Sequence, residues 1–83
     1  MNTRKLLAKL LVNQKNVKFT DLVKLLSCFD FTLDRVNGSH HIFVHKSISE
    51  IINIQNVKGE AKPYQVKQFL KIVEKNNLEF KEE

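Results

Sequence analysis

Cysteine and tryptophan are almost or wholly missing from this sequence. Its 83 residues contain one cysteine, Cys28, and no tryptophan. A single cysteine excludes an internal disulfide and is typical of proteins that fold in a reducing compartment, so we expect a cytoplasmic protein. Cys28 ends an apolar helical pattern, where a buried, inert thiol is the commoner outcome and a nucleophile the rarer one.

Long apolar runs are missing as well. No segment approaches the roughly 20 apolar residues of a membrane span, and none resembles a secretory leader, so we expect no membrane association. The length suits one small domain that buries a modest core without cross-links. Glycine and proline are scarce, and they mark a turn, a loop and a helix start: Gly38, Gly59 and Pro63.

Acidic residues are absent from residues 1–18, which carry five basic side chains. Residues 19–83 carry nine basic and nine acidic ones, so the whole net charge of +5 lies in the N-terminal segment. Its leucines fall near one side of a predicted helix: Leu6, Leu7, Leu10 and Leu11. Two interpretations stay open, a helix that contacts RNA phosphates through Lys5 and Lys9 and a helix packed on the domain with a solvated basic face. An organellar targeting peptide ranks third, because the segment is short and lacks serine.

The spacing of apolar residues divides the rest of the chain into two helices and three strands. The predicted elements are a helix over residues 20–28, strands over residues 31–36, 40–45 and 51–55, and a helix from Pro63 to Asn76. Thr20 is the expected N-cap of the first of these helices. Alternation places Phe31, Leu33 and Arg35 on one face of the first strand.

All three histidines follow the Asn37-Gly38 pair, at positions 40, 41 and 45. Asn-Gly favours a type I′ hairpin turn with positive φ at both residues. On a strand, His40 and His41 point to opposite faces, while His41 and His45 lie about 13 Å apart on one face. No two can readily bind one metal, so we expect no metal site and no cofactor. One histidine acting as base or acid near neutral pH is one interpretation, and three structural histidines are the other.

The order of helix, three-stranded antiparallel meander and helix predicts an α+β fold like that of double-stranded-RNA-binding domains. Both core helices then cover one face of the sheet, and residues 1–18 add an extra N-terminal helix. Here the sequence resembles the HicA family of bacterial toxins, through Gly-Ser-His at 38–40, the aromatic residue at 43 and the Lys-Pro helix start at 62–63. The resemblance covers about residues 19–78, within a domain that we expect to span residues 19–83.

The HicA resemblance implies a toxin of a type II toxin-antitoxin pair, a ribosome-independent mRNA endonuclease that a HicB antitoxin inhibits. The family's catalytic histidine follows Gly-Ser directly, which is His40 here. A non-catalytic RNA-binding module of the same fold is the alternative function, and a domain that binds another protein through its sheet is a third.

Cleavage of RNA needs a base for the ribose 2′-OH, an acid for the leaving oxygen and positive charge near the phosphate. His40 is the expected base or acid. Gly38 lets the backbone approach a phosphate, and Ser39 either orients His40, donates to a phosphate or caps the turn. Arg35 and Lys46, with Lys5 and Lys9, are candidate cations or ordinary solvated surface.

Ile42 and Val44 alternate with the neighbouring histidines and share the face of His40. If the helices cover the opposite face, these two residues form an exposed apolar patch, which small proteins rarely leave uncovered. We therefore expect a HicB-like antitoxin to dock on Ile42 and Val44 and to block His40. The reverse assignment of faces would bury His40 and remove it from chemistry.

Overall fold

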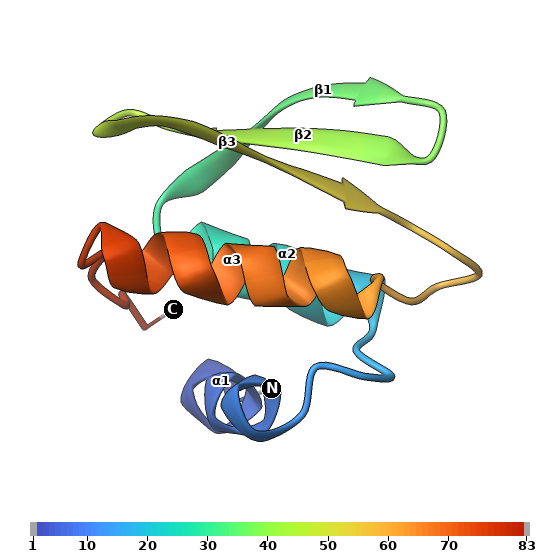
Figure 1. Ribbon diagram of the computed structural model, residues 1–83, viewed down its shortest axis with the longest axis horizontal. Coiled ribbons are helices and arrows are strands. Elements are labelled where there is room, and N and C mark those ends of the chain that lie inside the picture. The colour runs from blue at the N-terminus through green and yellow to red at the C-terminus, as the bar shows by residue number, and fades with distance from the viewer. Residues whose placement is uncertain (1, 83) are drawn as a thin grey trace.

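The computed structural model describes residues 2–82, and it arranges them in three layers (Figure 1). A three-stranded sheet forms the first layer, two helices the second, and one further helix the third. In chain order the elements are α1 (Thr3–Val12), α2 (Phe19–Cys28), β1 (Phe31–Asn37), β2 (His40–His45), β3 (Ile48–Gln55) and α3 (Pro63–Lys75). The predicted α+β architecture is therefore confirmed, with an extra N-terminal helix. The predicted N-terminal segment, residues 1–18, includes Met1, and the predicted domain, residues 19–83, includes Glu83. These two residues lie outside the described residues.

The sheet has the antiparallel order β1-β2-β3, and α2 and α3 cover one of its faces (Figure 1). We call the other face the open face. Asn37 pairs with His40, so the turn between β1 and β2 consists of Gly38 and Ser39. Gly38 has a φ of +58°, as the first central residue of a type II′ turn requires. The predicted type I′ turn at Asn37-Gly38 is therefore wrong by one residue.

A β-bulge interrupts β1 between Leu33, which pairs with Phe43, and Arg35, which pairs with Ile42. The predicted alternation did not include it and wrongly placed Arg35 on the same face as Phe31. Since the bulge shifts the register by one residue, Arg35 lies beside Ile42 on the open face. The third strand also starts earlier than predicted, at Ile48.

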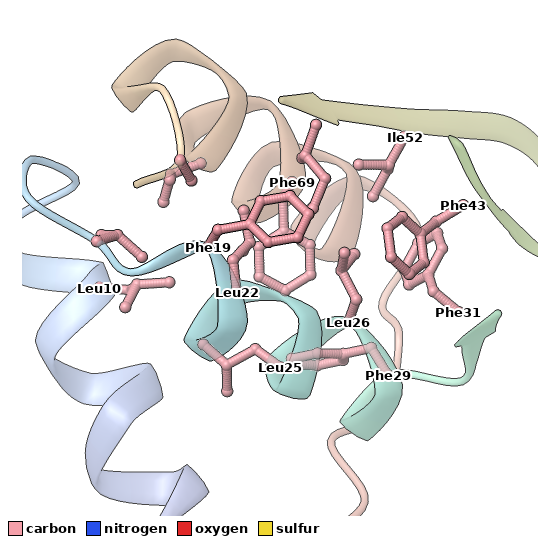
Figure 2. Close-up of a cluster of buried hydrophobic side chains, with 14 of the residues drawn as sticks. Leu10, Phe19, Leu22, Leu25, Leu26, Phe29, Phe31, Phe43, Ile52 and Phe69 are labelled. Atoms are coloured by element: carbon pink, nitrogen blue, oxygen red, sulfur yellow. The ribbon is translucent and has the colours of Figure 1, made fainter. Parts of the chain in front are cut away.

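The core lies between the sheet and the α2–α3 layer (Figure 2). Leu22 and Leu26 from α2 and Phe69 from α3 are fully buried there against Ile52 of β3. Helix α3 begins at Pro63, as predicted, and ends at Lys75 with Asn76 as its C-cap, one residue before the predicted end. Helix α2 begins one residue before the predicted start, so Lys18 and not Thr20 holds the N-cap position, and it makes no side-chain capping bond.

Helix α1 packs on the side of α2 that faces away from the sheet (Figure 1). Leu6 and Leu10 are buried, as the packed interpretation requires, whereas Leu11 is 62% exposed although the pattern placed it on the same side. Of the described helices, none combines the length and the apolar composition that crossing a membrane would require.

The segment after α3 contacts α1 and the end of α2 on the side of the molecule away from the sheet. Phe80 packs against the ring of Phe29 with 5.5 Å between centroids, and the backbone N–H of Lys81 donates to the carbonyl of Cys28 at 2.7 Å. Arg4 Nε of α1 donates to Glu82 Oε1 at 2.8 Å. The predicted burial of Cys28 is confirmed, since its side chain has no exposed surface.

Candidate functional site

His40 begins β2 and lies half-buried on the open face. Its Nδ1 is 3.2 Å from Oδ1 of Asn53 on the neighbouring strand β3. A carbonyl oxygen only accepts hydrogen bonds, so in this arrangement Nδ1 carries the proton and Nε2 keeps its lone pair. When the ring is neutral, this contact therefore favours the tautomer whose Nε2 carries no proton.

The other two histidines point to the helix-covered face, as predicted. The ring of His41 packs edge-on against Phe19 of α2 with 4.6 Å between centroids, and its Nδ1 is 3.2 Å from the carbonyl oxygen of Ser39. His45 packs against Phe31 at 5.1 Å and accepts a hydrogen bond from the backbone of Ser47 at 3.1 Å. Both therefore have structural partners, and His40 alone of the three is on the open face.

Among residues 2–82, no group of three or more His, Cys, Asp or Glu side chains is arranged so that it could hold a metal ion.

The turn before His40 leaves space for a ligand but does not orient the imidazole. A Cβ built on Gly38 would meet no atom within 4 Å, so the backbone here faces open space. The Ser39 hydroxyl is 3.5 Å from Nε2 of Gln55, and the Ser39 carbonyl accepts from the backbone of Asn56 at 3.1 Å. Ser39 thus ties the turn to β3, while Asn53 positions His40.

Of the predicted cations, only Arg35 shares the open face with His40, and its Nη1 is 3.1 Å from Oδ2 of Asp34. Lys46 follows the last residue of β2, so at about 3.3 Å per residue it lies about 20 Å from His40. Lys5 and Lys9 belong to α1, which the α2–α3 layer separates from the sheet (Figure 1). The structure does not bring these three lysines to His40.

Other lysines do lie at the His40 end of the sheet, on the loop after β3 and at the start of α2 (Figure 1). The backbone N–H of Asn56 binds the carbonyl of Ser39, and that of Phe19 binds the carbonyl of Gly59 at 2.9 Å. These contacts bring Lys18, Lys58 and Lys62 to the end where β2 begins, together with Glu60, the bridge partner of Lys18. Sequence reasoning did not single out Lys58 and Lys62 as cations near His40, because long-range backbone pairing brings them there.

The apolar surface beside His40 differs from the predicted one. Ile42 is on the open face but only 8% exposed, so its predicted exposure is wrong. Val44 is half-buried, and Ile51 on β3 is 51% exposed. Phe43 pairs with Ile52 on the helix-covered face, just before a register shift between Phe43 and His45. Val44 follows Phe43 and Ile51 precedes Ile52, so both side chains lie on the open face. We call these two apolar side chains of the open face, Val44 and Ile51, the apolar patch.

Comparison with known proteins gives one result. A family model described as HicA toxin of bacterial toxin-antitoxin systems matches residues 19–74, which run from the start of α2 to the last turn of α3. Comparison with curated proteins gave no significant match, and neither did comparison with solved structures. The match covers more than half of the chain, includes His40 and its turn, and leaves α1 outside. The chain belongs to the HicA toxin family of bacterial toxin-antitoxin systems.

Proposed function

We propose that this toxin is a metal-independent endoribonuclease that cleaves mRNA in the cytoplasm, with His40 as its proton-transfer group. The observation that carries the proposal is the bond between His40 Nδ1 and Asn53 Oδ1 on the open face. It leaves Nε2 as a basic nitrogen at a surface without covering helices. Membership of the toxin family supports an enzyme that acts on a cellular target.

RNA supplies its own nucleophile, so one imidazole and local positive charge suffice for the first step. Nε2 of His40 takes the proton of a ribose 2′-OH, and the 2′ oxygen attacks the adjacent phosphorus. The bond from phosphorus to the 5′ oxygen breaks, and that oxygen takes a proton from water. The products are a 2′,3′-cyclic phosphate and a 5′-hydroxyl end. General base catalysis contributes about 10²- to 10⁴-fold to such a step.

Growth arrest and RNA cleavage test this assignment. Wild type, His40→Ala and His45→Gln are expressed from a tight promoter, and each purified protein is incubated with RNA in excess EDTA. Wild type and His45→Gln should arrest growth and cleave RNA, while His40→Ala should do neither and keep its circular dichroism spectrum. Cleavage that stops on chelation and returns with zinc or magnesium would overturn the metal-independent mechanism.

The alternative is a non-catalytic RNA-binding module of the same fold. The lysines at the His40 end of the sheet favour it as much as they favour the enzyme. RNA binding by wild type without any cleavage would establish it.

A further inference from the structure

Tyr64 is a large aromatic side chain that the fold leaves on the surface. It lies in the first turn of α3 with 61% of its surface exposed, although the protein's six phenylalanines are all buried or half-buried. Tyrosine is enriched at binding interfaces, because its ring packs against apolar groups while its hydroxyl stays hydrated or hydrogen-bonded. An exposed ring of this kind is available to a partner.

Hydrogen bonds connect Tyr64 to the strand beside His40. Its hydroxyl accepts from Nε2 of Gln65 at 3.3 Å. Gln65 is 3% exposed, and its Oε1 accepts the backbone N–H of Gln55 at 2.8 Å. Gln55 is the cross-strand partner of His40. Tyr64 is therefore anchored along the outer edge of β3, at the end of the sheet where His40 lies.

A cation accompanies the ring. Lys62 Nζ is 6.0 Å from the centroid of the Tyr64 ring, within the range of a cation–π contact. Lys58 and Lys18 are exposed at the same end of the molecule. An aromatic face beside ammonium groups is the arrangement by which proteins bind single-stranded nucleic acid, with a base on the ring and phosphates on the lysines.

We propose that Tyr64 and Lys62 form a nucleotide-binding subsite for single-stranded RNA, in which one base stacks on Tyr64 and its phosphate contacts Lys62. The strand of RNA then runs from this subsite across Gln55 to His40. The link to cleavage rests on the proposed function, whereas binding at the subsite does not.

Fluorescence tests the stacking directly, because Tyr64 is the one tyrosine of a chain without tryptophan. His40→Ala protein, which does not cut the probe, is titrated with a short oligoadenylate and with an abasic ribose-phosphate oligomer of equal length. Quenching of the tyrosine emission by oligoadenylate, and not by the abasic oligomer, is the expected result. Equal quenching by both probes, or by neither, would overturn the subsite.

Substitutions separate stacking from a structural role of the tyrosine hydroxyl. Stacking on an aromatic side chain contributes about 1–3 kcal/mol per base, so Tyr64→Ala should weaken oligoadenylate binding about 5- to 140-fold. Tyr64→Phe keeps the ring and should retain the wild-type Kd. Leu11→Ala, equally exposed at 62% but on α1, is the matched control and should change nothing. Equal losses in Tyr64→Ala and Tyr64→Phe would contradict stacking.

The salt dependence tests Lys62. Removing one phosphate contact lowers the log-log salt slope for a single strand by about 0.7, and Lys62→Gln should show this change. Lys71→Gln is the control, because Lys71 also belongs to α3 but borders the groove between α1 and α3. An unchanged slope in Lys62→Gln would remove Lys62 from the subsite.

Failure of this proposal can be distinguished from failure of the enzyme assignment. If oligoadenylate quenches Tyr64 while wild type cuts no RNA, the proposed nuclease fails and the subsite stands. If wild type cuts RNA and Tyr64→Ala binds it with wild-type Kd, the nuclease stands and the subsite is wrong.

Discussion

His40 Nδ1 and Asn53 Oδ1 lie 3.2 Å apart across two neighbouring strands of the open face. If this bond fixes the tautomer of His40, Asn53→Ala should lower kcat while leaving KM unchanged. A typical net hydrogen-bond contribution of about 0.5–1.5 kcal/mol corresponds to about a 2- to 13-fold loss of kcat. A rise in KM with kcat unchanged would instead assign Asn53 to substrate binding.

Asn53→Asp tests the contact between His40 and Asn53 in a second way, through the pH dependence of the cleavage rate. A carboxylate beside the ring favours the protonated imidazolium, so the acidic limb of the pH–rate profile should move to higher pH. Gln68→Glu is the comparison variant, since it adds the same charge on α3, in the groove lined by Glu50 and Lys75 and away from the open face. A profile that does not move in Asn53→Asp would contradict proton transfer by His40.

Val44 and Ile51 are expected to bind a HicB-like antitoxin, which would cover His40 at the same time. Family membership implies an antitoxin partner, and the patch is the apolar part of the open face. Val44→Thr combined with Ile51→Thr should leave the protein folded and toxic but no longer neutralised by co-expressed antitoxin. Val57→Thr is the control, because Val57 is 42% exposed on the loop after β3 and outside the patch. A double variant that the antitoxin still binds and neutralises would place the interface elsewhere.

Leu10 and Leu11 are adjacent in α1 and should respond differently to the same truncation. Leu10 is 2% exposed and Leu11 is 62% exposed. Leu10→Ala removes a buried side chain and should reduce the free energy of unfolding by about 2–5 kcal/mol. Leu11→Ala should change it by no more than about 0.5 kcal/mol. Urea denaturation measures both, and equal effects would show that α1 does not pack as described.

Asp30 and Lys81 form an ion pair whose contribution to stability depends on pH. The hydrogen bond from the Lys81 ammonium, with Nζ 2.7 Å from Oδ2 of Asp30, lowers the pKa of Asp30 and raises the pKa of Lys81. Stabilisation by Asp30 is thus present above the carboxyl's unfolded pKa and lost as pH falls through its folded pKa. Stabilisation by Lys81 is present below the amine's unfolded pKa and lost as pH rises through its folded pKa.

Lys81→Gln should therefore melt at a lower temperature than wild type between about pH 5 and 9, where both partners are charged. The two melting temperatures should converge in strong acid and in strong base. Both groups are solvent-exposed, so added salt should reduce the difference. A constant difference at every pH would mean that Lys81 acts through its packing alone.

Local sequence patterns were enough to predict the helices, the strands and the faces of the three histidines. Side-chain alternation fixed His40 opposite His41, and Pro63 marked the start of α3 because proline suits the first helical turn. The resemblance at 38–40 then selected His40. These features depend on neighbouring residues alone, which is why one sequence revealed them.

Features that depend on contacts between distant residues could not be predicted from the sequence. The bulge that turns Arg35 to the open face has no residue signature of its own, since it follows from the fit of β1 to β2. Lys58 and Lys62 reach the His40 end through backbone bonds between residues about 40 positions apart in the chain, Phe19 and Gly59. Tyr64 was missed for the same reason, because only the three-dimensional fold places α3 beside β3.

The contact between Arg4 and Glu82 brings the two ends of the described chain together on the side away from the open face (Figure 1). An affinity tag or a surface anchor attached at either end would therefore leave His40 and the apolar patch unobstructed. The same closeness suits a circular permutant, in which a short linker joins the ends and a new opening is cut at the turn after Lys46. Such a variant would present the open face on an immobilised protein.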